Sequence, residues 1–267
     1  MKDFLSIKEF SKFTGIGQTT LRYWDDIGLF VPAKRDPDNN YRYYSPEQII
    51  AVNFITVMSS LKVPLKTISE VGQKRDPELI IDMIEQQENI LDMEMRRLRE
   101  SYSIIHTRRE LIKRGLRADE SKISVQYRDE QPIILGPPTE FKGNEPFYEP
   151  FKRFCSAARE MRINLNYPIG GYHESVESFL NAPGKPDRFF SLDPTGYDKQ
   201  AAGDYMLGFK RGYYGEINDL AERMKAYADE QSLALTGSVY IVYLHDETCV
   251  NDPSQYLAQA CIAVARK

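Results

Sequence analysis

Residues 18–44 read QTTLRYWDDIGLFVPAKRDPDNNYRYY, and this stretch decides the fold of the N-terminal part of the chain. Its first third predicts a short helix over residues 17–26, which ends at Gly28 because glycine is a strong helix stop. Residues 32–44 cannot continue that helix, since they contain two prolines and an Asp-Asn-Asn run, which are typical of turns. The tyrosines within residues 41–44 favour a strand, so we expect a small β-hairpin, or wing, after the helix.

The residues before this stretch predict another short helix. Ser6 and Glu9 have the S-x-x-E spacing of a capping box, and a helix is expected to follow over residues 7–13. A break at residues 14–16, with a glycine at its centre, separates it from the helix over residues 17–26. Two short helices joined by such a turn fit a helix-turn-helix, and an ordinary helical hairpin fits the spacing about as well.

After the wing, the sequence predicts two further short helices. Ser45 suits an N-cap, and Pro46 suits the first position of a helix that runs to about residue 61. Pro64 interrupts this helix, and another short helix is expected over residues 65–73.

Residues 77–116 predict a long helix in a coiled coil, because a heptad pattern of apolar side chains runs through them. Glu88 and Arg109 occupy core positions near opposite ends of this helix. In an antiparallel pair, Glu88 of one copy approaches Arg109 of the other, whereas in a parallel pair like charges meet, so we expect an antiparallel homodimer. A single long helix that packs on its own domain is the alternative. The predicted dimerisation residues are Ile84, Leu91, Met95, Leu98, Tyr102, Ile105 and Ile112.

Residues 119–267 alternate between strand and helix patterns and predict an α+β domain with a mostly antiparallel sheet. Helices are expected over residues 145–161 and 217–231. The segment 168–196 is rich in glycine and proline and is a candidate lid or insertion. The expected strands cover residues 123–127, 133–135, 205–211, 238–245 and 259–265.

The charge of the chain is unevenly distributed. Its 35 Lys and Arg against 39 Asp and Glu give a net charge of −4, which as an average argues against a nucleic-acid binder. Residues 1–75 carry a net charge of +3, however, whereas residues 76–118 carry −1 and residues 119–267 carry −6. The N-terminal segment is therefore mildly basic.

Cysteine use and hydropathy indicate the compartment. The three cysteines are far apart and form no C-x-x-C motif, so neither a disulfide framework nor a thiolate zinc site is expected. The sequence has no secretory signal pattern and no apolar run long enough to span a membrane. These features favour a reducing cytoplasm, and we expect no membrane partner, no metal and no cofactor.

Three groups of residues in the N-terminal segment, in their spacing, resemble the MerR family of bacterial transcription regulators. They are LRYWD at 21–25, GLF at 28–30 with Pro32, and DP at 36–37 with YRYY at 41–44. The resemblance covers about the first 75 residues. It implies a winged helix-turn-helix DNA-binding domain over residues 1–75, a dimerising antiparallel coiled-coil helix with a linker over 76–118, and an effector-binding domain over 119–267.

The C-terminal segment is similar to the GyrI-like effector domain of the multidrug-sensing branch of that family. The likeness lies in the order of elements and in short fragments, which are Tyr148 with FKRF at 151–154, Tyr167, YAD at 227–229 and SVY at 238–240. It implies a duplicated β-α-β-β fold with a ligand cavity between its halves.

The expected DNA-binding residues come from the second helix, the wing and a later turn. Gln18, Thr19 and Thr20 open the helix that is expected in the major groove. The resemblance implies that Arg22 and Tyr23 contact the backbone or base edges, that Tyr41, Arg42 and Tyr43 clamp phosphates, and that Lys62 contacts the centre of the site. We expect Tyr44, and one of Tyr23 and Trp24, to lie in the core.

A twofold dimer implies a pseudo-palindromic promoter site. The resemblance further implies an activator that bends and untwists the promoter spacer so that RNA polymerase can engage.

The resemblance also implies a small organic effector held by aromatic side chains, which bind flat apolar or cationic molecules. Core filling is the alternative role for these side chains. The relatives place a buried glutamate where this chain has Ile241, which puts a preference for lipophilic cations in question. The candidates are Phe147, Tyr148, Tyr167, Tyr172, Phe189, Tyr205, Phe209, Tyr240 and Tyr256.

Other roles for the C-terminal domain stay open. No cysteine precedes Cys155, so the soft ligands of the metal-sensing branches are missing. The domain could bind a protein partner, or hydrolyse small molecules as some GyrI-like domains do. Because the sequence shows no Ser/His/Asp or Cys/His arrangement of recognisable spacing, we expect no enzyme.

Overall fold

The computed structural model describes residues 4–74, 76–142 and 145–266, and the chain divides into two compact units. The N-terminal unit comprises residues 1–97, and the C-terminal unit comprises residues 98–267. One helix, α5 (Pro77–Arg117), contributes residues to both. None of the described helices is long and apolar enough to cross a membrane.

Helices α1 (Ile7–Thr14) and α2 (Gln18–Asp26) form the helix-turn-helix pair that the sequence predicts. The expected capping box is present, since the Ser6 hydroxyl accepts the Glu9 N–H and the Glu9 carboxylate accepts the Ser6 N–H at 2.8 Å. Gly15 ends α1 with a φ of 73°, a left-handed conformation that glycine adopts without strain.

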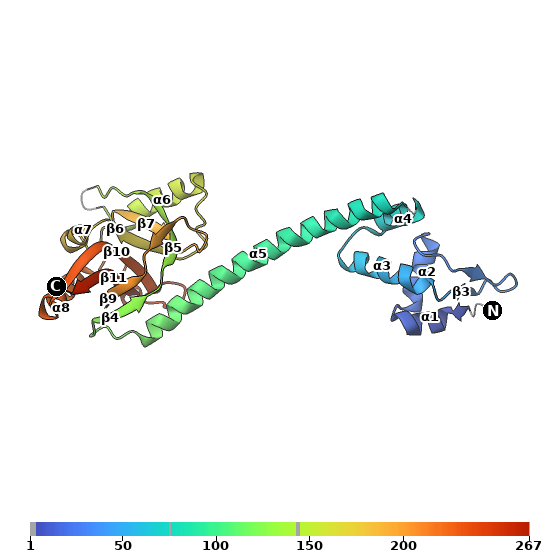
Figure 1. The fold of residues 1–267 in the computed structure, drawn as a ribbon, viewed down its shortest axis with the longest axis horizontal. Helices are drawn as coiled ribbons and strands as arrows, with labels where there is room; N and C mark the ends of the chain where they lie inside the picture. The colour runs from blue at the N-terminus through green and yellow to red at the C-terminus, as the bar shows by residue number, and fades with distance from the viewer. Residues whose placement is uncertain (1–3, 75, 143–144, 267) are drawn as a thin grey trace. The chain divides into compact units, whose positions relative to one another are not determined.

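Strands β2 (Lys34–Arg35) and β3 (Arg42–Tyr44) form the predicted wing, which Figure 1 shows projecting from the helices of the N-terminal unit. β3 also pairs with β1 (Leu5–Ser6), so this antiparallel sheet has the order β1-β3-β2. The wing is thereby joined to the residue that begins α1.

Aromatic rings form the centre of the N-terminal core. The rings of Phe10, Phe30 and Tyr44 stack on one another with centroid separations of 4.5 to 5.9 Å. Tyr44 is fully buried, as expected, and of the neighbours Tyr23 and Trp24 it is Trp24 that lies in the core.

Helices α3 (Gln48–Ser60) and α4 (Leu65–Lys74) complete this unit with the first turns of α5. The prediction of Ser45 as N-cap is wrong, because α3 begins at Gln48. The Gln48 side chain forms hydrogen bonds with the backbone of the preceding segment instead. Its Oε1 accepts the Ser45 N–H at 3.0 Å, and its Nε2 donates to the Val31 carbonyl at 2.8 Å.

A buried ion pair attaches the wing to α2. The side chain of Asp25 is 1% exposed, and its Oδ2 accepts hydrogen bonds at 2.5 Å from Arg35 Nη2 and from Arg42 Nε. Arg42 also reaches Asp26 Oδ1 at 3.1 Å. Because a carboxylate removed from water must be matched by cations or donors, these arginines allow Asp25 to be buried and fix the hairpin against the helix.

Among the described residues, eight strands form the antiparallel sheet of the C-terminal unit, in the order β4-β9-β11-β10-β6-β7-β5-β8 (Figure 1). The predicted α+β domain with an antiparallel sheet is confirmed. The strands are β4 (Ser124–Arg128), β5 (Gln131–Pro138), β6 (Ile169–His173), β7 (Arg188–Ser191), β8 (Asp198–Gln200), β9 (Gly203–Arg211), β10 (Leu233–His245) and β11 (Leu257–Arg266). The helices are α6 (Tyr148–Glu160), α7 (Val176–Asn181) and α8 (Asn218–Glu230), with a 3-10 turn at Pro253–Gln255.

Two β-α-β-β segments make up most of this sheet. The first runs through β5, α6, β6 and β7, and the second through β9, α8, β10 and β11. In each, the third strand lies between the other two, and β6 of the first pairs with β10 of the second.

The segment 168–196 is therefore not a lid or an insertion, because it supplies β6, α7 and β7. Close packing accounts for at least one of its glycines, since a Cβ at Gly170 would lie 2.5 Å from the Phe190 ring.

Side chains alternate across the sheet and build two cores on its opposite faces. Ile241 and Ile262 pack on the face that α8 covers. Tyr240 and Cys261 lie on the other, which we call the inner face, together with Leu111 of α5. The last turns of α5 therefore cover part of the inner face.

The contact between α5 and the inner face is close. The imidazole Nε2 of His245 donates to the Ile112 carbonyl at 3.2 Å. A Cβ at Gly115 would lie 2.5 Å from the same imidazole, so the glycine allows the helix to approach the strand.

Replacing Asp25 by Asn should lower the free energy of unfolding of the N-terminal unit by about 1.5–3 kcal/mol, because hydrogen bonds to a charged group are weakened. Urea unfolding followed by the fluorescence of Trp24, the single tryptophan, which is buried in this unit, measures the change. Asp26→Asn is the matched control. Its side chain is 67% exposed, so the loss should stay below about 1 kcal/mol, and equal losses would contradict the role given to Asp25.

Candidate functional site

The exposed face of α2 carries four of the residues expected at DNA. Thr19, Thr20, Arg22 and Tyr23 are exposed, and Gln18 is half-buried. The opposite face of the helix is packed into the core through leucine and tryptophan side chains. The helix thus presents a polar edge away from its own unit.

The wing places its three predicted residues in different surroundings. Tyr41 is 44% exposed, and its ring centroid lies 5.5 Å from that of the half-buried Tyr43. Arg42 is turned toward α2, where Asp25 and Asp26 hold its guanidinium. The hydrogen bond to Asp25 raises the pKa of Arg42, so the arginine stays charged within this ion pair.

The sequence analysis missed the roles of Asp25 and Arg35 in this arrangement. Asp25 follows Leu21 by four positions, which places it on the buried side of the helix, and that was the one available signal. Nothing in the spacing shows which cations meet a carboxylate there, because the two arginines come from a hairpin whose register the residues alone do not specify.

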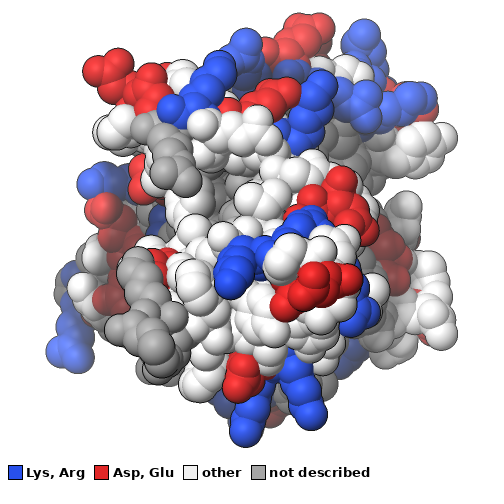
Figure 2. Space-filling view, turned by 90° about the vertical axis from the view of Figure 1, so that its right-hand side faces the viewer, with Lys and Arg blue, Asp and Glu red and all other residues white. Residues whose placement is uncertain are grey.

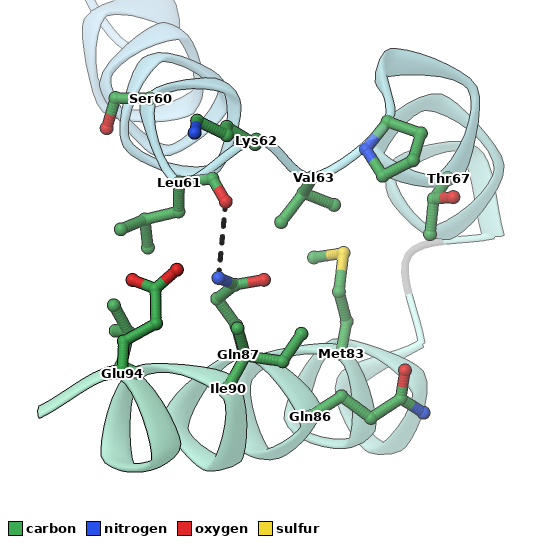
Figure 3. A pocket seen from close by; sticks show the side chains of 12 residues that line it. Ser60, Leu61, Lys62, Val63, Thr67, Met83, Gln86, Gln87, Ile90 and Glu94 are labelled. Carbon is green, nitrogen blue, oxygen red and sulfur yellow. Dashed lines mark hydrogen bonds between the residues drawn. The ribbon is translucent and has the colours of Figure 1, made fainter. Parts of the chain in front are cut away.

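Lys62 lies in the turn between α3 and α4, where it is exposed and adopts a left-handed φ of 64°. A hollow of about 430 Å³ lies between this turn and the first turns of α5. Figure 3 shows Leu61 and Val63 on one wall and Met83 and Gln87 on the other. Gln87 Nε2 donates to the Leu61 carbonyl across the hollow at 3.2 Å.

Basic side chains do not dominate the face that Figure 2 shows. In the view of Figure 2, Lys and Arg are interspersed with Asp and Glu rather than gathered into one continuous patch. Ion pairing with Asp25 further reduces the positive charge that Arg35 and Arg42 can offer to a phosphate. A single copy therefore offers little electrostatic attraction to nucleic acid.

The nine aromatic residues expected at an effector do not gather in one place. Phe147 and Phe189 contact each other beside α6, with ring centroids 5.6 Å apart. Tyr172, Tyr205, Phe209 and Tyr240 belong to the inner face. Tyr256 clusters with Tyr213 and Tyr214, Tyr167 is buried, and Tyr148 is 52% exposed on α6.

A cleft of about 820 Å³ opens at the inner face, between the last turns of α5 and strands β4, β9 and β11. Phe209 lines it together with polar and charged side chains. A smaller and deeper cavity shares Arg114, Arg128 and Gln259 with the cleft and is also lined by Tyr240. Of the nine predicted residues, Phe209 and Tyr240 thus line these two hollows.

Ile241, the position of the glutamate in the relatives, lies on the opposite face. It is 5% exposed and packs in the core beneath α8. The residue at this position therefore does not set the charge of the cleft. Within the described part of the chain, no group of His, Cys, Asp or Glu side chains is arranged to hold a metal ion.

Comparison with known proteins adds a family match. Residues 5–74 match the family described as MerR HTH family regulatory protein. The chain is 24% identical over 270 residues to the multidrug-efflux transporter 2 regulator of Bacillus subtilis, which covers 99% of this chain and 97% of that protein. It is 40% identical over 94 residues to the transcriptional regulator BrlR of Pseudomonas aeruginosa, covering 34% of this chain and 35% of that protein.

Among solved structures, the chain is similar to one in a cryo-EM structure of an EcmrR–DNA complex. The sequence identity is 18% and the TM-score is 0.40, with 98% of this chain and 100% of that chain covered.

Proposed function

Because residues 5–74 form a MerR-family helix-turn-helix domain, we propose that this chain is a transcription regulator that binds a pseudo-palindromic promoter site as a homodimer and responds to a small organic effector. The family match, together with the exposed polar edge of α2 beside an anchored wing, carries the proposal. The relative aligned over nearly the whole chain is named a multidrug-efflux transporter regulator, which supports an organic effector.

In this proposal α2 enters the major groove. Gln18, Thr19 and Thr20 stand at its N-terminal end, where side chains reach base edges, and Arg22 and Tyr23 follow one turn later beside the backbone. Tyr41 and Tyr43 of the wing, and Lys62, supply further donors to phosphate oxygens. Arg42 serves chiefly to hold the wing at the right place beside α2.

The dimer is supported by apolar side chains that α5 leaves uncovered. Met95 is 47% exposed, and Leu98, Tyr102 and Ile105 are each 68% exposed. Exposed apolar side chains at heptad spacing indicate pairing with another helix. A second copy is the occupant we propose, in the antiparallel sense, because Glu88 of one chain then meets Arg109 of the other.

Effector binding has a direct route to that dimer helix. The cleft of the C-terminal unit is walled by α5 residues from Glu110 to Arg117, so a molecule bound there contacts the helix that pairs the two copies. The two β-α-β-β segments on either side of the β6–β10 pair support the GyrI-like duplication. A shift of α5 on effector binding changes how the two helix-turn-helix domains of the dimer are held. The dimer then bends and untwists the promoter DNA so that RNA polymerase can engage, and in this way the regulator acts as an activator.

Arg22→Ala should weaken binding to specific and non-specific DNA about equally and lower the salt slope of log K by about 1, because one phosphate contact is lost. Gel shifts over a series of salt concentrations measure both quantities. Arg42→Ala should also weaken binding, with the additional loss of stability expected when the Asp25 pair is broken. Arg159→Ala, on α6, is the control and should leave the slope unchanged. Unchanged affinity in Arg22→Ala and Arg42→Ala would count against this interface.

Leu98→Glu should convert the dimer to a monomer, because a carboxylate replaces an apolar side chain in the paired surface. Sedimentation equilibrium measures the mass. Ile50→Glu, at a position that is 78% exposed on α3, is the matched control and should remain a dimer.

Engineered cysteines test the direction of pairing. In a background without Cys155, Cys249 and Cys261, a mixture of Glu88→Cys and Arg109→Cys chains should form disulfide-linked pairs. Glu88→Cys chains alone should not, since the two copies of residue 88 lie near opposite ends of an antiparallel pair. Efficient coupling between two copies of residue 88 would rule out the antiparallel arrangement.

A further inference from the structure

We infer that the cleft on the inner face of the C-terminal sheet binds an organic anion, with a carboxylate as its head group, through Arg114, Arg128 and Gln259. The inference deepens the proposed function, on which it rests, because it names the chemical class of the effector. Aromatic pockets of the kind expected from the sequence favour apolar or cationic molecules, so the two expectations can be separated by experiment.

Three guanidinium groups in the lining have no carboxylate within ion-pair distance among the described residues. They belong to Arg114 and Arg117 on α5 and to Arg128 at the end of β4. Other charged side chains of the unit form salt bridges, but among the described residues these three arginines form none.

Most of the acidic side chains in the cleft are already paired with lysines. Glu110 lies 3.5 Å from Lys113, and Asp119 lies 2.9 Å from Lys122. Glu130 is paired with a lysine of β8, outside the lining, at 2.8 Å. Asp129 is the acidic residue left over, so the cleft carries more positive than negative charge that a ligand could meet.

Gln259 indicates which kind of atom a ligand would supply in the cleft. Arg114 Nη1 donates to Gln259 Oε1 at 3.0 Å, and because a guanidinium can only donate, this bond fixes which end of the amide faces Arg114. The amide nitrogen Nε2 is then left without a hydrogen-bond partner, although Gln259 is 1% exposed. A buried donor without an acceptor is costly, so this position favours an acceptor from a ligand.

Arg114 and Arg128, which line the same cavity, also favour a hydrogen-bond acceptor, because a guanidinium group can only donate. Burial, and then the charge of Arg128, lower the pKa of Arg114 to about 10, which leaves it protonated at neutral pH. Arg114, Arg128 and Gln259 each line both the cleft and the deeper cavity, so two like charges and an unpaired N–H flank the place where these hollows join. A carboxylate offers two acceptor oxygens in the planar geometry that guanidinium groups match.

The cleft has room for the organic part of the ligand, because its volume is about 820 Å³ and Leu207 and Phe209 belong to its lining. The deeper cavity, of about 20 Å³, admits little more than one water-sized group. Leu111, Phe190 and Tyr240 line it on the apolar side, and no carboxylate belongs to its described lining. A cationic head group would therefore meet only repulsion from Arg114 and Arg128 at this point. An anionic head group beside these arginines, with its apolar body in the larger cleft, therefore fits the site.

The test compares two ions of nearly the same shape on the full-length protein. Isothermal titration calorimetry without DNA is done with naphthalene-2-carboxylate and with naphthalen-2-ylmethylammonium. We expect the carboxylate to bind at least about tenfold more tightly than the ammonium ion, the difference that one hydrogen bond between charged groups supplies. Tighter binding of the ammonium ion, equal binding of the two, or no binding of either at millimolar concentration overturns the inference.

Matched variants place the anion within the cleft. Arg128→Gln should weaken binding of the carboxylate about tenfold or more and remove the preference between the two ions. Lys122→Gln, at another cation of the same cleft that is already paired with Asp119, should change the affinity less than about threefold. Equal losses in the two variants would show a diffuse charge effect and contradict the site.

Arg114→Gln gives a second measurement, with circular dichroism as the check that the buried substitution leaves the unit folded. If it unfolds the protein, the Arg128→Gln result stands as the deciding one. Failure here is distinguishable from failure of the proposed function. If the unmodified protein binds DNA but shows no preference for the carboxylate, the anion site is wrong and the proposed function stands. If it binds the carboxylate but no DNA, the proposed function as a regulator is wrong.

Discussion

The uninterrupted course of α5 is the constraint on which the rest of the structure depends. Its 41 residues contain a single proline, at the first position, where the missing N–H costs nothing. Met83 near one end belongs to the N-terminal core, and Leu111 near the other belongs to the inner-face core of the C-terminal sheet. Both units therefore use the same helix as part of their packing, and apolar side chains in its middle are exposed.

Charge is arranged differently in the two units, although each contains arginines that matter. In the N-terminal unit, Arg35 and Arg42 are satisfied by the buried Asp25, and their positive charge is used to build the wing. In the C-terminal unit, Arg114 and Arg128 meet no such carboxylate among the described residues. The first arrangement stabilises a fold, and the second leaves donors that a ligand can satisfy, since a buried charge needs a partner from somewhere.

The order of elements could be predicted from the sequence because local patterns specify it. The capping box at Ser6, the turn residues of the wing and the apolar repeat of α5 each act within a few residues. Segment 168–196 could not be assigned in this way, because its two strands, which pair with each other, are held in the sheet by the distant strands β10 and β5. The glycine and proline content of this segment suggested a lid or an insertion, yet Gly170 serves close packing, since a Cβ there would lie 2.5 Å from the Phe190 ring.

The candidate sites divide in the same manner. The sequence by itself determined the helix-turn-helix with its wing, the long helix α5 and the exposed polar edge of α2, because helical period and turn chemistry decide which side chains face out. Only the tertiary structure decided that Arg42 turns toward Asp25, that Ile241 faces α8, and that Arg114, Arg128 and Gln259 line one cavity. These contacts join residues from different elements, and the distance between such residues depends on strand register and helix packing, which no local pattern contains.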